Sequence, residues 1–147
     1  MYGERGTAGA AVTADLATIR IAAMPDRIGQ QVYNMLRERL NPHGRPADPR
    51  YVLSVTLSET RENLFLEEDE TATRANLTLR ATYVLRRADK DEVVVQGTTR
   101  SVSSYDILSS QFATIVSEED ARTRSARAIS DDIRTRLALA LSGDGAS

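Results

Sequence analysis

The sequence predicts an α+β fold in which two helices cover one face of a four-stranded, largely antiparallel or mixed sheet. Two observations predict this class. Apolar and polar residues alternate in four segments, as in half-buried strands, and in two other segments apolar residues recur every three or four positions, as on amphipathic helices. The segments follow the order strand, helix, strand, strand, strand, helix. Two such helices form a two-layer sandwich with the sheet and leave its other face polar.

The first strand is predicted over residues 16–22, LATIRIA, where apolar and polar side chains alternate. Pro25 breaks this strand, and Asp26 offers an N-cap to a helix that runs to Leu40. The loop over residues 41–46 contains two prolines and a glycine, and it therefore ends the helix. One face of the helix is apolar and consists of Ile28, Val32, Met35, Leu36 and Leu40.

Three strands follow this loop. The alternating pattern predicts the second strand over residues 51–58 and the third over residues 76–85. A polar turn at residues 89–91 leads into the fourth strand, which runs from Val93 to about Tyr105.

The turn also predicts the register of this hairpin. Centring it on Lys90 places Leu85 opposite Val95 on the buried face and Arg80 opposite Arg100 on the polar face. A slip of one residue would turn Arg100 into the core, so it is disfavoured.

The last helix is predicted from Ser117 to Leu141. Ser117 and Asp120 approximate a capping box, and the acidic first turn complements the positive end of the helix. Gly143 is expected to end the helix. Its buried stripe consists of Ile129, Ile133, Leu137 and Leu141.

Length and composition limit both the domain count and the chemistry. A chain of 147 residues fits one domain, so we expect a flexible tether over residues 1–15, a single domain over residues 16–142 and a disordered tail over residues 143–147. There is no cysteine and only one histidine, His43, which excludes disulfides, thiolate metal sites and multi-histidine sites within this chain. No candidate nucleophile has an accompanying base, so we expect no enzyme, no metal and no cofactor. The formal charge of −2 predicts no nucleic-acid partner.

The polar face of the predicted sheet carries hydroxyl groups and arginines but no acid before Glu62 at its margin. This segregation predicts an anion-binding surface, because guanidinium groups bind phosphate and carboxylate through two parallel hydrogen bonds. One interpretation is a stand-alone anion- or RNA-binding α+β domain, although the chain lacks the exposed aromatic residues on which single-stranded RNA stacks. The candidate binding residues are Arg20, Arg74, Arg80, Arg86 and Arg100.

The connection between the second and third strands combines an acidic and an apolar segment. The four acids at residues 67–70 match no Ca²⁺-binding loop and predict a solvated hairpin tip. Leu64, Phe65 and Leu66 directly precede them. These three residues either cap the end of the core or contact a partner, and we expect the partner contact.

The sequence resembles the alphaproteobacterial form of LptE, the lipopolysaccharide-assembly lipoprotein family. The resemblance is distributed over most of the chain rather than concentrated in a signature. Its segments are Tyr2-Gly3, LATIRIA (16–22), PDRIGQQVYNMLRERLNP (25–42), PRYVLSVTL (49–57), TRANLTLRATYVL (73–85), SSYDILSSQFAT (103–114) and SEEDARTRSARAISDDIRTRL (117–137).

The resemblance implies a non-catalytic subunit of the lipopolysaccharide transport machinery at the periplasmic face of the outer membrane. Members of the family plug the LptD β-barrel, assist its assembly and bind lipopolysaccharide on its way to the cell surface, so LptD and lipopolysaccharide are the implied partners. The family is lipidated on a cysteine shortly before the Tyr-Gly pair, and this chain has no cysteine. We therefore expect the membrane anchor to be a lipidated cysteine upstream of this chain.

Overall fold

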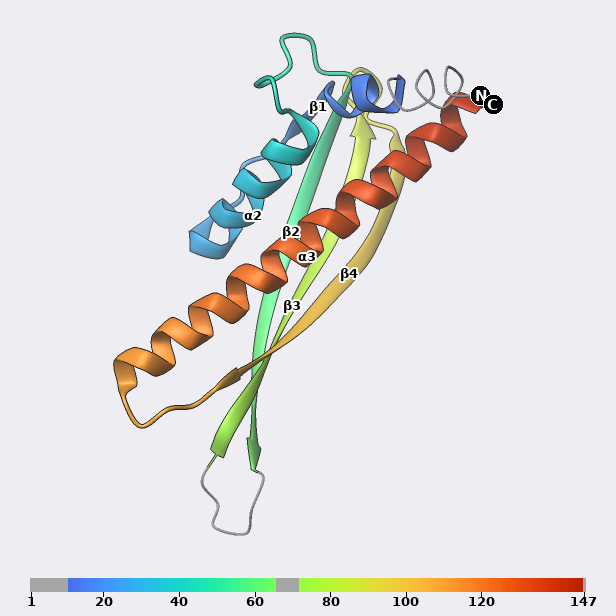
Figure 1. Ribbon diagram of the computed structural model, residues 1–147. Helices are drawn as coiled ribbons and strands as arrows, with labels where there is room; N and C mark the ends of the chain where they lie inside the picture. The colour runs from blue at the N-terminus through green and yellow to red at the C-terminus, as the bar shows by residue number, and fades with distance from the viewer. Residues whose placement is uncertain (1–10, 66–71, 147) are drawn as a thin grey trace, which may run out of the picture.

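Four strands form one mixed sheet, and two helices lie on one of its faces (Figure 1). The computed structural model describes residues 11–65 and 72–146, and the side chains of 65, 72–73 and 143–146 are outside this description. The strand order is β1-β2-β3-β4, with β1 parallel to β2 and the other pairs antiparallel. In chain order the elements are β1 (Ile19–Ile21), α2 (Asp26–Leu40), β2 (Tyr51–Phe65), β3 (Ala72–Arg87), β4 (Val93–Asp106) and α3 (Gln111–Ala146). The predicted fold class is confirmed.

The core lies between the helices and the inner face of the sheet. Helix α3 packs against β3 and β4, and α2 packs beside α3 (Figure 1). Each fully buried side chain of this size stabilises the fold by about 1.5–3 kcal/mol. The predicted apolar stripes supply these side chains: Val32, Leu36 and Leu40 from α2, Ile129, Ile133, Leu137 and Leu141 from α3, and Leu53, Leu79 and Leu85 from the sheet.

Helix α3 differs from the prediction at both ends. It begins at Gln111 rather than Ser117, because the Ser110 hydroxyl accepts a hydrogen bond from the Ala113 N–H (3.3 Å) and so caps the earlier start. The helix also continues past Gly143 to Ala146. Glycine costs only about 1 kcal/mol relative to alanine within a helix, so it does not compel an end there.

The β2–β3 hairpin is longer than predicted. Strand β2 continues beyond Ser58 to Phe65, and β3 begins at Ala72. Charged residues such as Glu59 and Arg61 interrupt the apolar alternation in this part, but β3 provides them with a continuous antiparallel partner. The hairpin extends to the end of the molecule where α3 begins (Figure 1).

The expected tether falls mainly on residues 1–10, which lie outside the described residues. Its last part, over residues 11–15, is helical, and Val12 packs against the core. This helical turn continues to the buried Leu16 and lies at the same end of the molecule as the last turns of α3 (Figure 1).

Candidate functional site

The outer face of the sheet carries two arginines directly opposite each other. Arg80 of β3 pairs with Arg100 of β4, and the same ladder pairs Leu85 with Val95, so the predicted register is confirmed. Directly opposed side chains in an antiparallel pair lie about 5 Å apart at their Cβ atoms. The two guanidinium groups can therefore reach one common ligand.

Hydroxyl groups surround this arginine pair. Ser58 of β2 is the partner of Arg80 on its other side, and two residues further along β3 the Thr82 and Thr98 hydroxyl oxygens lie 3.4 Å apart. Both Arg80 and Arg100 are exposed, and within the described residues neither forms an ion pair. Two like charges that face each other without a counterion are destabilising, so the pair favours an external anion.

Arg74 and Arg86 differ from the central pair, because each lies close to a carboxylate. Arg74 Nε lies 3.5 Å from Asp106 Oδ1, and Arg86 Nε lies 3.7 Å from Asp91 Oδ1. Asp106 is the strand partner of Arg74 and faces the same side of the sheet, but this pair lies beyond the level of Glu62 and Asn76, so it does not contradict the expectation of no acid on this face before Glu62. The sequence prediction missed Asp106 because it ended the fourth strand at about Tyr105.

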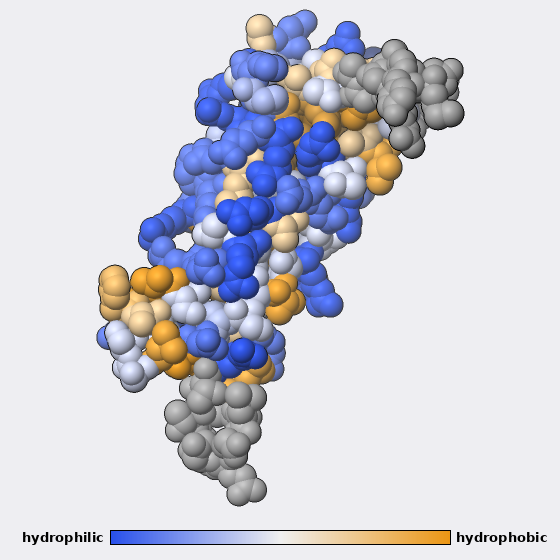
Figure 2. Space-filling model, in the orientation of Figure 1, coloured by the Kyte–Doolittle hydropathy of each residue, from blue (hydrophilic) through white to orange (hydrophobic). Residues whose placement is uncertain are grey.

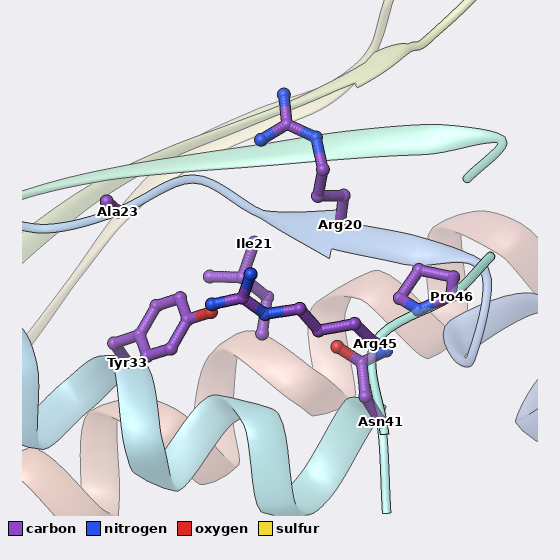
Figure 3. Close-up of a pocket in the computed structure, with 7 residues that line it drawn as sticks. All are labelled: Arg20, Ile21, Ala23, Tyr33, Asn41, Arg45 and Pro46. Carbon is purple, nitrogen blue, oxygen red and sulfur yellow. The ribbon is translucent and has the colours of Figure 1, made fainter. Parts of the chain in front are cut away.

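Arg20 lies apart from the central pair, on the edge strand β1. Its strand partner is Val52, whereas the partner of Arg80 on β2 is Ser58. Six residues of strand correspond to about 20 Å. Arg20 instead lines a pocket of about 190 Å³ at the edge of the sheet (Figure 3). The remaining lining residues are Ile21, Ala23, Tyr33, Asn41, Arg45 and Pro46.

The expected partner-contact segment is only partly within the described residues. Leu64 is half-buried near the end of β2, while the side chain of Phe65 and all of Leu66 lie outside them. The strand ladder places Leu64 opposite Arg74, and Arg74 opposite Asp106. The end of the hairpin is therefore at the same end of the sheet as the connection from β4 to α3.

That connection and the first turns of α3 carry an exposed apolar cluster that the sequence prediction missed. Phe112 is 76% exposed, and the cluster lies at the end of the molecule where α3 begins (Figure 2). If the helix is taken to begin at residue 111, helical periodicity places residues 112, 115 and 116 on one face with no strand beneath it, and this predicts the cluster. The members of this distal apolar cluster are Leu108, Phe112, Ile115 and Val116.

A charged cluster fixes the first half of α3 to the inner face of the sheet. Arg122 forms ion pairs with Glu59 (2.7 Å) and Glu118 (2.8 Å), and Glu118 also binds Arg61 at 3.1 Å. Tyr105 donates a hydrogen bond to Glu118 Oε2 at 3.2 Å. Burial alone would raise the pKa of Glu118, but the hydrogen bonds from Arg122 and Tyr105 and the two positive charges lower that pKa below its usual value. Each charge is matched, so we interpret this cluster as structural.

Two further observations concern the described residues only. Over 11–65 and 72–146, no three His, Cys, Asp or Glu side chains come together in a way that could hold a metal ion. No helix in these ranges combines the length and apolar character needed to cross a membrane.

These features define a class: a two-layer α+β domain whose notable surfaces are an arginine- and hydroxyl-rich sheet face and an apolar end. The sequence model of LptE, described as lipopolysaccharide-assembly, matches residues 16–137. The chain belongs to the LptE family.

Solved structures share the fold. A protein described as a lipoprotein from Caulobacter crescentus CB15 is 26% identical, with a TM-score of 0.78 over 91% of this chain and 97% of that one. A minor lipoprotein from Acinetobacter baumannii is 16% identical, with a TM-score of 0.62 over 82% of this chain and 88% of that one. Rare lipoprotein B from Shewanella oneidensis is also 16% identical, with a TM-score of 0.60 over 87% and 94%. No curated protein sequence matches the chain.

Proposed function

We propose that this chain is a non-catalytic, outer-membrane lipoprotein subunit of the lipopolysaccharide transport machinery. In this role it plugs the LptD β-barrel, assists its assembly and binds lipopolysaccharide during delivery to the cell surface. Membership of a lipopolysaccharide-assembly family supports the process, and lipoproteins among the structural neighbours support an anchor on a cysteine upstream of this chain.

One observation carries the binding part of the proposal: Arg80 and Arg100 face each other on the open side of the sheet without an acidic partner among the described residues. Two guanidinium forks at this spacing suit a phosphate group, which accepts charge-assisted hydrogen bonds from both. Lipopolysaccharide supplies such phosphates. Arg74 and Arg86 then have a secondary role, because a carboxylate already lies within 4 Å of each.

The test is the double variant Arg80→Gln, Arg100→Gln titrated with purified lipopolysaccharide. We expect the affinity to fall about tenfold at low salt, equivalent to about 1.4 kcal/mol, and the difference from wild type to shrink as salt screens the charges. The melting temperature should stay the same or rise, because the change removes a like-charge pair worth up to about 1 kcal/mol.

The matched control is Arg37→Gln, Arg127→Gln. Both residues are exposed on the helical layer, so this variant has the same net charge while the sheet face is intact. It should bind lipopolysaccharide as the wild type does. Equal losses in both variants would reduce the effect to overall charge, and unchanged affinity in the sheet-face variant would rule out this site.

A further inference from the structure

The short strand β1 pairs with only a small part of β2 (Figure 1). Its three residues lie beside Tyr51, Val52 and Leu53, whereas β2 continues to Phe65. The last backbone hydrogen bond across this edge runs from the Ala22 N–H to the Leu53 carbonyl oxygen at 2.8 Å, and among the described residues none continues the pairing. Beyond Leu53, in the described part of the chain, β2 is therefore an edge strand with β3 on one side only.

This open edge of β2, residues 55–63, differs from the edge at β4. Two arginines of α3 bind carbonyl oxygens of β4, as Arg136 does at Thr98 and Arg124 at Ser104. On β2, by contrast, every residue from 58 to 63 is exposed. Long exposed strand edges are templates for pairing with another chain. The open edge is thus a candidate interaction surface.

The backbone groups available at this edge belong to alternate residues. The Leu53 carbonyl points to the β1 side of β2, and strand geometry directs the N–H and C=O groups of every second residue to the same side. The ladder with β3 is regular up to Leu64, so this alternation continues along the open edge. An added strand can therefore form hydrogen bonds with the odd-numbered residues from 55 to 63.

We propose that this edge pairs antiparallel with the same edge of a second copy of the chain, so that the two sheets become one. A two-fold axis perpendicular to the sheet passes through the position of Thr60 and keeps the helices of both copies on the same face. Leu57 then lies opposite the partner's Asn63, so the new ladder spans residues 57–63 and stops short of β1, which ends opposite Leu53. Such self-complementary contacts are typical of two-fold homodimers.

The charges of the edge favour this register. With the axis at Thr60, each Glu59 lies opposite the partner's Arg61, and opposite charges in directly opposed positions stabilise a sheet. An axis at Glu59 or at Arg61 would instead place two like charges opposite each other, which is destabilising. Arg61 is accessible for this contact, because its side chain is 57% exposed while Nη1 lies 3.1 Å from Glu118 Oε2.

The space along β2 favours the same register. An axis at Ser58 would place the partner's Asn63 opposite Leu53, a position that β1 already occupies. An axis at Glu62 would pair Glu59 with the partner's Phe65, the last residue of β2, and leave the preceding part of the edge unpaired. Of the axes that the charges allow, only the one at Thr60 pairs the whole exposed segment. This self-association goes beyond the proposed role in lipopolysaccharide transport and does not depend on it.

Disulfide trapping tests the position of the axis. The chain has no cysteine, so one introduced thiol is a specific probe. Directly opposed residues of a non-hydrogen-bonded antiparallel pair have Cα atoms about 4.5 Å apart, which a disulfide can bridge. Thr60→Cys should therefore form a covalent dimer under mild oxidation. The matched control is Ser58→Cys on the same face of β2, where the two thiols would be about 13 Å apart along the ladder and should react at least about tenfold more slowly.

Charge exchange tests the register in the reversible dimer. We expect sedimentation of the wild type to show a monomer that becomes a dimer as concentration rises. Glu59→Lys and Arg61→Glu should each weaken the dimer at least about tenfold, because each homodimer would oppose like charges. An equimolar mixture of the two variants should dimerise again, because the introduced lysine of one then lies opposite the introduced glutamate of the other. Each variant also loses an ion pair with α3, which mixing does not restore, so recovery in the mixture reports on the interface alone.

Three results would overturn the proposal. The first is a wild type that remains monomeric up to about 1 mM, which would leave the open edge to a strand of another protein. The second is equal rates of disulfide formation for Thr60→Cys and Ser58→Cys. The third is a mixture of the two charge variants that dimerises no better than either variant alone.

Discussion

The arginines of this protein differ in what lies beside them. On α3, Arg136 lies 2.9 Å from Asp132 and Arg124 lies 3.1 Å from Asp120, each one helical turn away. Such exposed pairs contribute only some tenths of a kcal/mol and leave little free charge for a ligand. Arg80 and Arg100 on the open sheet face, and Arg20 and Arg45 beside β1, lack such partners among the described residues. Whether an arginine is free to bind a ligand therefore depends on its position in the fold and not on the number of arginines in the chain.

A single glycine permits the close packing of the β3–β4 hairpin. Gly97 is the strand partner of the buried Tyr83, and a Cβ atom at Gly97 would lie 2.7 Å from the Tyr83 hydroxyl oxygen and 3.0 Å from Cζ. We therefore expect Gly97→Ala to destabilise the protein by about 1–3 kcal/mol. Thermal unfolding should show a loss of roughly 3–10 °C in melting temperature.

The cause of this effect is tested in a double-mutant cycle with Tyr83→Phe. Phenylalanine lacks the hydroxyl oxygen that the new Cβ meets first, so Gly97→Ala should cost clearly less in the Tyr83→Phe background. An equal cost in both backgrounds would contradict the steric explanation and point to the backbone conformation of Gly97 instead.

At the scale of elements, α3 determines both the stability and the accessibility of the sheet. Arg136 donates to the Thr98 carbonyl oxygen at 3.2 Å, and Arg124 donates to the Ser104 carbonyl oxygen at 3.0 Å. These carbonyls belong to β4, an edge strand whose unpaired backbone groups would otherwise invite pairing with another chain. The helix thus protects the sheet edge while the outer face stays open.

The charged cluster between α3 and β2 should make stability depend on pH. Because the pKa of Glu118 is lowered in the folded protein, its ionised form stabilises the fold above the usual pKa of glutamate. This contribution is lost as the pH falls through the lowered pKa. We expect Glu118→Gln to be less stable than wild type at about pH 7, and the difference to diminish toward about pH 3. Denaturant unfolding across this range measures it.

Glu119→Gln is the matched control for this prediction. Glu119 lies one residue away, and among the described residues its only ion pair is with Arg27, whose side chain is 87% exposed. Its variant should remain close to wild type at every pH, because an exposed pair of this kind is worth little. A stability difference for Glu118→Gln that does not change with pH would assign its effect to packing rather than to charge.

The sequence predicts the elements well where apolar periodicity is strong and less well where charged residues interrupt it. The alternation in β3 and the Lys90 turn determine the register that brings Arg80 to Arg100. The β2 extension through Glu59 and Arg61 has no such pattern, since those side chains are satisfied by Arg122 and Glu118 on α3. Long-range ion pairs of this kind have no signal in local sequence.

The sequence also predicted the candidate site only in part. Strand parity identifies the arginines that face outward, but it does not give the distance of Arg20 from the others or the ion pair between Arg74 and Asp106. The β1 pocket depends on Tyr33 and Arg45, which lie on a helix and in a loop. Their proximity to Arg20 follows from how α2 packs, and no residue spacing in the sequence predicts it.

At the scale of the whole molecule, the surfaces are arranged along an elongated body (Figure 1). One end holds the helical turn over residues 11–16 and the last turns of α3. The opposite end holds the β2–β3 hairpin and the distal apolar cluster (Figure 2). Leu64, the described member of the expected partner-contact segment, lies at this same end of the sheet.

The last prediction tests whether the distal end contacts the LptD barrel. Phe112 and Ile115 are 76% and 50% exposed, so replacing both with serine removes little buried surface, and the melting temperature should stay within about 3 °C of wild type. If these residues enter an interface, the double variant should recover much less LptD when co-purified from the outer membrane, because apolar anchors dominate interface energy. The control Val93→Ser, Leu139→Ser changes two apolar residues that are also exposed, outside this cluster, and should recover LptD normally. A drop in melting temperature of the first variant would make Phe112 and Ile115 part of the core, and normal LptD recovery by it would exclude this end from the complex.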